Sequence, residues 1–327
     1  HSGEIIAMSS LPDFDPNNRP RALTHGNASD SPLFNRAVQG VYELGSTFKP
    51  FTIAQAMELK LIKADTMIDT KGPLKWGRYS IRDYKNYGPE LSVEKVLVKS
   101  SNIGTARISL MIGSELQKVF LGRLGLLEAT PIELIEGPTG KPLYPSNWSD
   151  ISTMTISYGH GISTSPVHLA AAYAALVNGG TLVKPTILKQ SASLIGERVI
   201  SQKVSMRLRS MLRRVVTDGT ASRFGEVKGY SVGGKTGTSD KHNSQGGYHD
   251  DKVLATFASF FPSSDPKYVL IVTLDEPEDR TGSEPRRTAG YTAVPIAAEV
   301  IRRVAPLLGI APEIESKGHN SLTLANN

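Results

Sequence analysis

Two apolar runs near the end of the chain constrain its fold more than any other feature of the sequence. They are VLATFASFFP, residues 253–262, and KYVLIVTLDEP, residues 267–277. Both are rich in β-branched and aromatic residues, which fit the pleated surface of a sheet, and a short polar turn separates them. We therefore predict two strands of an antiparallel sheet at this end of the chain.

The middle of the chain has apolar residues at helical spacing instead, beginning with residues 46–62. Residues 91–113 predict two short helices with a break near Ser100–Asn102. Further helices are predicted at residues 116–126, 167–180, 203–219 and 295–309. A strand is also predicted at residues 3–10, whereas residues 70–90 are turn-rich and polar and residues 128–150 are rich in Pro and Gly.

With strands at both ends of the chain and helices between them, the order of elements predicts an α+β fold. We expect an antiparallel sheet of about five strands flanked by helices, with an all-helical subdomain inserted into it. The α/β part would comprise about residues 1–48 and 185–310, the helical subdomain about residues 49–184, and a polar tail residues 311–327. Because the chain begins at HSGEIIAM, already within a predicted strand, we expect it to be a fragment of a longer protein.

The composition excludes several classes of function. The 37 Lys and Arg outnumber the 31 Asp and Glu, but they are spread along the chain, so we expect no nucleic-acid partner. The chain has no cysteine, which excludes disulfides, thiol catalysis and thiolate metal sites. No apolar run in the sequence approaches the roughly 20 residues that a membrane-spanning helix needs.

The stretch GYSVGGKTGTSD, residues 229–240, matches the pattern G-x-x-x-x-G-K-[ST] of a phosphate-binding loop. Such a loop needs an apolar strand before it and a helix N-terminus after it. The preceding ASRFGEVK is too polar for a buried strand, and the following GTSDKHNSQGGYHDD has too much Gly, Asn and Ser to start a helix. The context therefore argues against a nucleotide hydrolase.

The same residues fit a different anion. On the edge of a strand, Lys235 offers a fixed cation, Thr236 a hydroxyl, and Gly237 leaves room for a substrate backbone to lie alongside. Such an edge suits a peptide that ends in a carboxylate.

The segment STFKP, residues 46–50, supplies a nucleophile. Proline is tolerated only near a helix start, so Ser46 is predicted at or just before a helix N-terminus, where free N–H groups stabilise developing negative charge. Ser46 and Lys49 are spaced i and i+3 and therefore share one face of the helix. A buried lysine with a lowered pKa is a base able to activate a serine.

The segment Ser100-Ser101-Asn102 adds a hydroxyl able to pass a proton and an amide able to orient Lys49 and a substrate. Ser-x-x-Lys, Ser-x-Asn and Lys-Thr-Gly, in this chain order, occur together in β-lactamases and penicillin-binding proteins. Each motif alone is common by chance. The three in order, with the serine at a helix start and the second lysine ahead of the strand-rich end, are specific.

On these residues the chain resembles the transpeptidase domain of class B penicillin-binding proteins over nearly its whole length. NRAVQGVYELGSTFKPF resembles the family's nucleophile region, KSSNIG its second motif, GGKTGTS its third, and SYGHGISTSPVHLAAAYAALVNGG the helix under its site. Asn102 and the LDEP ending of the last strand resemble the cell-division type. Leu44 stands where the family usually has Pro, and His160 where it commonly has Tyr.

The resemblance implies a peptidoglycan D,D-transpeptidase that acts in septal cell-wall synthesis. Ser46 would attack the D-Ala–D-Ala carbonyl of a stem peptide, with Lys49 as general base. The backbone N–H groups of Ser46 and Thr238 would hold the oxyanion. Ser100 would relay the proton to the departing D-Ala amine, and Asn102 would orient Lys49 and the donor amide.

The resemblance also implies the binding partners and the setting of the reaction. Lys235, Thr236 and Thr238 would grip the terminal carboxylate, and an amine of a second stem peptide would resolve the acyl-enzyme. No metal and no cofactor is implied. β-Lactam antibiotics would acylate Ser46, and in the full-length protein a glycosyltransferase and other division proteins would be partners. The expected location is the extracytoplasmic (periplasmic) face of the membrane, with an N-terminal anchor outside this fragment.

Two other functions remain open on the same motifs. A β-lactam hydrolase would need a general base for deacylation; Glu133 and Glu136 lie between the second and third motifs, but no Glu-x-x-x-Asn spacing occurs there. We therefore expect a long-lived acyl-enzyme. A penicillin-sensing receptor domain would be labelled by penicillin but would not cross-link peptides.

Other conspicuous side chains favour structural roles. His242 and His249 flank a Gly-rich stretch that predicts a solvated hairpin tip at the rim of the site rather than a metal site. His160, between two glycines, is expected to shape a turn. The tyrosines of the turn-rich segment are expected to cover the helical subdomain: Tyr79, Tyr84 and Tyr87.

Overall fold

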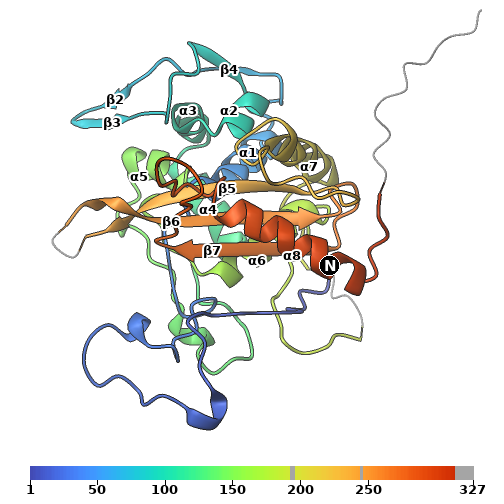
Figure 1. The fold of residues 1–327 in the computed structure, drawn as a ribbon. Coiled ribbons are helices and arrows are strands. Elements are labelled where there is room, and N and C mark those ends of the chain that lie inside the picture. Colours follow the sequence, from blue (N-terminus) through green and yellow to red (C-terminus); the bar gives the residue numbers. More distant parts are fainter. Residues whose placement is uncertain (192–195, 244–245, 314–327) are drawn as a thin grey trace, which may run out of the picture.

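The structure, a computed structural model, describes residues 1–191, 196–243 and 246–313 (Figure 1). Its centre is an antiparallel sheet of three strands in the order β5 (Gly233–His242), β6 (Tyr248–Phe261) and β7 (Tyr268–Asp275). Thr256 of β6 lies opposite Gly237 on one side and Thr273 on the other. The two strands predicted from the apolar runs are therefore confirmed, and the Lys-Thr-Gly motif lies on the edge strand β5.

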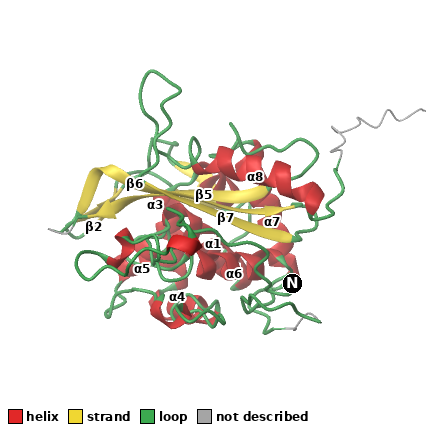
Figure 2. Ribbon diagram, turned by 60° about the horizontal axis from the view of Figure 1, so that its bottom comes forward, coloured by secondary structure: helices red, strands yellow, loops and turns green. Residues whose placement is uncertain are grey.

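Helices cover both faces of the sheet (Figure 2). α8 (Ala293–Leu307) packs on β6 and β7 from one side, and α6 (Pro166–Val177) packs on the same strands from the other. Every residue of β6 from Val253 to Phe261 is buried as a result. Burial on both faces explains why this strand appears in the sequence as a continuous apolar run.

Six further α-helices are present among the described residues. They are α1 (Lys49–Glu58), α2 (Val93–Lys99), α3 (Asn102–Ile112), α4 (Ser114–Arg123), α5 (Asp150–Ile156) and α7 (Gln202–Thr217). All the predicted helices are found, including the break between α2 and α3. α5 was not predicted; its N-cap is Ser149, whose hydroxyl accepts the N–H of Ser152.

One hydrophobic core joins these helices to the sheet. It includes Phe51 of α1, Leu97 of α2, Leu176 of α6, Leu212 of α7 and Phe257 of β6. Because interiors of this kind are close-packed, the helices that carry the first two motifs are held in a fixed relation to the sheet that carries the third.

The strand predicted at residues 3–10 is not formed, and three strands rather than about five make up the sheet in the described part of the chain. A single bridge joins Glu4 to Thr186, with the Ile5 N–H donating to Thr186 O over 2.8 Å. The ladder does not extend toward Leu188, because the N–H that the next rung would use donates instead to the Thr186 hydroxyl, over 3.1 Å. Gly3, with a φ of +78°, also departs from strand geometry.

The turn-rich segment contains small strands that the sequence did not indicate. β1 (Met67–Asp69) pairs with β4 (Glu90–Ser92), and β2 (Leu74–Trp76) with β3 (Tyr79–Ile81). The stretch expected to be all-helical therefore carries two antiparallel pairs. The prediction for Tyr84 was wrong, because its side chain is 89% exposed, whereas Tyr87 packs against the main core.

The remaining predictions about organisation concern the boundaries and the end of the chain. The division into an α/β part and a helical subdomain near residues 48 and 185 stays a prediction. The predicted tail, residues 311–327, lies outside the described residues beyond Glu313, whose N–H donates to Gly229 O over 2.6 Å. No described helix has the length and apolarity needed to cross a membrane.

Candidate active site

Ser46 lies in a short 3-10 turn, Gly45–Phe48, that runs directly into α1. Pro50 is in the first turn of that helix, where its missing N–H leaves no hydrogen bond unmade. The Nζ of Lys49 donates to Ser46 Oγ over 2.9 Å. The structure thus brings the serine and the lysine of the first motif into direct contact.

Ser100 and Asn102 approach the same lysine from the break between α2 and α3. Ser100 has a left-handed backbone, with a φ of +64°, which ends α2 and turns the chain before α3 starts. Lys49 Nζ donates to Ser100 O over 2.7 Å, to Ser100 Oγ over 3.0 Å and to Asn102 Oδ1 over 2.7 Å. The first two motifs therefore meet at one amine.

Lys235 reaches this cluster from β5. Its Nζ donates to Ser100 Oγ over 3.0 Å and to the carbonyl of Thr236 over 3.0 Å. Both Lys49 and Lys235 are completely buried. Lys235 is therefore a cation beneath the strand, in contact with Ser100, rather than an exposed one.

Burial changes the acid–base properties of both lysines. Loss of hydration lowers the pKa of Lys49 well below its ordinary value of 10.5, the nearby charge of Lys235 lowers it further, and the carboxylate of Asp83 raises it. Burial lowers the pKa of Lys235 to about 7. A neutral Lys49 amine in contact with Ser46 Oγ has a free electron pair that can accept the serine proton.

The two threonines of the third motif lie on the opposite side of β5 from Lys235, as strand alternation requires. Thr236 Oγ1 is 2.6 Å from Thr220 Oγ1, and Thr238 Oγ1 accepts the N–H of Ala289 over 3.0 Å. Thr238 is partly exposed, and its hydroxyl proton remains able to bind an acceptor.

Gly237 packs against the chain itself. A Cβ at this position would lie 2.3 Å from Leu44 O and 2.9 Å from a side-chain carbon of Thr47. The space that we expected a substrate backbone to use is thus taken up by the segment that carries Ser46. A Cβ on Gly45 would in turn lie 3.0 Å from Thr238 O and 3.4 Å from Thr238 N, so the backbone of Thr238 abuts the residue before Ser46.

Two residues that sequence reasoning missed support the Ser46 turn. The hydroxyl of Tyr173, on α6, donates to Thr47 O over 2.7 Å, and its ring meets Phe51 edge to face at 5.5 Å. The carboxylate of Glu43 accepts the N–H of Gly161 over 2.6 Å and the hydroxyl of Tyr248 over 3.1 Å. A tyrosine within an apolar helix and a lone glutamate gave no sequence signal for these contacts.

His160 lies in the turn that Glu43 holds. The preceding Gly159 packs so tightly on Gly45 that a Cβ there would lie 2.0 Å from Gly45 O. Burial lowers the pKa of His160, and its ring lies 5.3 Å from that of Tyr158 and 6.1 Å from that of Tyr248. The side chain of His242 is outside the described part of the structure, so the structural role expected for His242 and His249 stays a prediction.

The two glutamates weighed for deacylation have other partners. Glu133 accepts the Thr186 hydroxyl over 2.8 Å and the N–H of Ile187 over 3.1 Å. Glu136 accepts the side-chain amide of Asn35 over 2.9 Å. Both carboxylates hold loop segments together.

Comparison with known proteins places this geometry among related chains. A family model described as the penicillin binding protein transpeptidase domain matches residues 1–302. The probable peptidoglycan D,D-transpeptidase FtsI of Caulobacter vibrioides is 36% identical over 336 residues, covering 100% of this chain and 55% of the relative. The probable peptidoglycan D,D-transpeptidase PenA of Neisseria gonorrhoeae is 33% identical over 311 residues, which cover 95% of this chain and 51% of that relative. The chain thus spans about half the length of these relatives.

A solved structure shares the fold. The apo transpeptidase domain of Burkholderia pseudomallei penicillin-binding protein 3 is 32% identical and superimposes with a TM-score of 0.78, over 86% of this chain and 83% of that one.

Proposed function

Because this chain belongs to the penicillin-binding protein transpeptidase domain family, we propose that it is the catalytic part of a peptidoglycan D,D-transpeptidase that cross-links stem peptides through an acyl-enzyme on Ser46. The observation that carries the proposal is the buried amine of Lys49, which lies within hydrogen-bond distance of Ser46 Oγ, Ser100 Oγ and Asn102 Oδ1. The relatives described as peptidoglycan D,D-transpeptidases support the same chemistry.

In the acylation step, neutral Lys49 takes the proton of Ser46, and the serine oxygen attacks the carbonyl between the two D-Ala residues. The amine is suited to this because burial favours its uncharged form. The N–H groups of Ser46 and Thr238 would stabilise the oxyanion, each contributing about 3 kcal/mol in comparable sites. The close packing of Gly45 on the Thr238 backbone supports this pairing.

The leaving D-Ala amine must receive a proton as the peptide bond breaks. Ser100 Oγ is suited to deliver it, because Lys49 and Lys235 both contact this oxygen and can resupply its proton. Asn102 accepts from Lys49 through Oδ1 and so keeps the amine aimed at the two serines. An amine of a second stem peptide then attacks the acyl-enzyme and frees Ser46.

The terminal carboxylate of the donor peptide would bind along β5. Thr236 and Thr238 offer hydroxyls on the face away from Lys235, whose buried positive charge adds electrostatic attraction. A β-lactam with its ring carboxylate would bind the same way and acylate Ser46. We propose that neither Glu133 nor Glu136 deacylates it, since both are bound to loop residues.

The setting of the reaction is also a proposal. Kinship with proteins described as FtsI and PenA, together with Asn102 and the LDEP ending, favours a role in septal wall synthesis. We propose that the full-length protein works at the extracytoplasmic face of the membrane with a glycosyltransferase and other division proteins.

The test is a cross-linking assay with a synthetic pentapeptide donor ending in D-Ala–D-Ala and an amine acceptor. Release of D-Ala together with an acceptor adduct is expected, and Ser46→Ala is expected to abolish both. D-Ala release without an adduct would indicate that water, rather than the acceptor amine, resolves the peptidyl acyl-enzyme. Rapid turnover of a β-lactam would indicate a β-lactam hydrolase, and penicillin labelling without D-Ala release or an adduct would indicate a receptor domain.

A further inference from the structure

Asp83, in the loop between β3 and β4, binds the start of the helix that carries Asn102. Its Oδ2 accepts the hydroxyl of Ser101 over 2.7 Å. Its Oδ1 accepts the backbone N–H of Asn102 over 2.6 Å and that of Ile103 over 3.0 Å. One half-buried carboxylate thus makes three hydrogen bonds to three consecutive residues of the second motif region.

These bonds complete the N-terminus of α3. The first N–H groups of a helix have no partner within it, and an anion is favoured there by the helix dipole. Ser101 serves as the N-cap and accepts the N–H of Gly104 over 2.9 Å. Asp83 accepts the N–H groups of the two residues before Gly104. Each of the first three N–H groups of α3 therefore has a side-chain acceptor, which fixes the backbone that follows Ser100.

Arg82, the residue before Asp83, orients the side chain of Asn102. The amide nitrogen of Asn102 donates to Arg82 O over 3.0 Å. Because a carbonyl can only accept, this contact determines which end of the amide is the nitrogen. The amide oxygen is then directed to Lys49 Nζ, at 2.7 Å. Arg82 and Asp83 together therefore set the acceptor that Lys49 meets.

Asp83 also acts on Lys49 through its charge. Its carboxylate raises the pKa of Lys49, against burial and against the positive charge of Lys235. His160, in the turn on the other side of the Ser46 segment, is a further titratable group within the field of Lys49. The position of Asp83 therefore affects both the geometry and the protonation of the proposed base.

We propose that Asp83 is a positioning residue for the transpeptidation reaction, which holds Ser100 and Asn102 against Lys49 from a loop outside the three motifs. The inference rests on the proposed function. The excursion of the chain through β1–β4 would then deliver a carboxylate to the active site, which gives this surface segment a role in catalysis (Figure 1).

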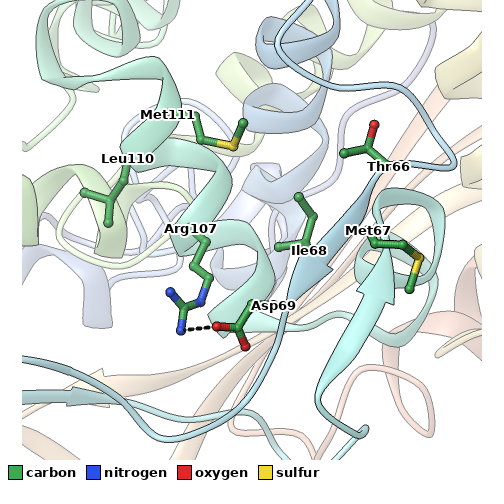
Figure 3. A pocket seen from close by; sticks show the side chains of 7 residues that line it. All are labelled: Thr66, Met67, Ile68, Asp69, Arg107, Leu110 and Met111. Carbon is green, nitrogen blue, oxygen red and sulfur yellow. Dashed lines mark ion pairs between the residues drawn. The ribbon is translucent and has the colours of Figure 1, made fainter.

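Two substitutions separate the geometric effect from the electrostatic one. Asp83→Asn keeps an oxygen that can accept both backbone N–H groups but removes the charge, whereas Asp83→Ala removes every contact. Asp69→Asn is the matched control: Asp69 also belongs to this excursion and pairs with α3, through an ion pair of 2.9 Å to Arg107 (Figure 3). Its other carboxylate oxygen accepts the N–H of Lys71 over 2.8 Å, away from the second motif, and the side chain is about half exposed.

The measurement is the second-order rate constant for acylation by a fluorescent penicillin from about pH 5 to pH 9, with the melting temperature of each variant. The acylation rate constant of Asp83→Ala is expected to be about 100-fold lower than that of the wild type, which is the size of effect that a misplaced catalytic group produces. Asp83→Asn is expected to lose less, and its acid limb is expected to move to lower pH because the charge that raises the pKa of Lys49 is gone. Asp69→Asn is expected to match the wild type.

The acylation rates decide whether Asp83 has this positioning role. An Asp83→Ala rate within twofold of the wild-type rate, or equal losses of rate in Asp83→Ala and Asp69→Asn, would overturn it. If Asp83→Ala does not fold, an Asp83→Asn profile superimposable on that of wild type would overturn it instead. A wild-type chain that penicillin does not label would remove the proposed function as well, which distinguishes the two failures.

Discussion

Lys49 and Lys235 donate hydrogen bonds to the same oxygen, Ser100 Oγ, each over 3.0 Å. Two ammonium groups that share one hydroxyl lie about 5 Å apart, and at an effective dielectric constant near 20 their repulsion is about 3 kcal/mol. Both side chains are also completely buried. The pair therefore favours a state with fewer than two positive charges, which makes one amine available as a base.

We expect acylation by a β-lactam that carries a carboxylate to follow a bell-shaped pH profile. The rate rises with pH as Lys49 loses its proton, and burial places this limb well below the ordinary pKa of 10.5. It falls again as Lys235, with a pKa of about 7, loses the charge that attracts the carboxylate. Stopped-flow acylation rates across the pH range measure both limbs.

Lys235→Arg provides the control for the alkaline limb. An arginine stays charged throughout the range, so the fall at high pH is expected to disappear even where the overall rate is lower. A wild-type rate that keeps rising from about pH 6 to pH 10 would contradict this assignment.

The buried Lys235 also predicts how stability depends on pH. Its pKa of about 7 in the folded chain lies below the ordinary 10.5, so between these values the unfolded chain binds a proton that the folded chain does not. The contribution of this residue to stability therefore rises with pH over that interval. In urea titrations, the stability of wild type relative to Lys235→Met is expected to increase from about pH 7 to pH 9.5; a constant or falling difference would count against it.

Tyr173→Phe tests the support beneath Ser46, the proposed nucleophile. The change keeps the ring packing but leaves Thr47 O, at a fully buried residue, without the hydroxyl that donates to it. We expect a loss of about 1–2 kcal/mol in the free energy of unfolding and a several-fold slower acylation of Ser46. Urea denaturation and the labelling rate measure the two effects, and an unchanged value of both would show that the contact is unimportant.

Gly237→Ala tests the contact between β5 and the Ser46 segment. The added methyl would lie 2.3 Å from Leu44 O, so the turn must move away from the strand. We expect acylation to fall by more than about tenfold. Gly122→Ala in α4 is the matched control, because its methyl would meet nothing closer than 3.7 Å and is expected to stabilise the helix by about 0.5–1 kcal/mol. Equal labelling rates in the two variants would contradict the prediction.

The features that could be predicted from the sequence are those that depend on residues adjacent or close to one another in the chain. The strands β6 and β7 have long, mostly apolar runs, α7 and α8 have apolar residues on one face, and each motif occupies only a few adjacent positions. The reach of Lys49 to Ser46 follows from their spacing alone.

Features that depend on residues far apart in the chain could not be predicted. Asp83 meets Ser101 across 18 residues, Tyr173 meets Thr47 across 126, and Gly237 meets Leu44 through a missing side chain. None of these has a local pattern. The strand expected at residues 3–10 fails for the same reason, since it needed a partner segment whose next N–H group, that of Leu188, donates to the Thr186 hydroxyl instead.

The role of Ser46 is tested most directly by locating a β-lactam adduct. The purified chain is incubated with benzylpenicillin, digested, and mapped by mass spectrometry, beside Ser46→Ala and Lys49→Ala. We expect one penicilloyl group per chain on the peptide that contains Ser46, none in Ser46→Ala, and a much slower reaction in Lys49→Ala. An adduct on another residue, or undiminished labelling of Ser46→Ala, would contradict the proposed mechanism.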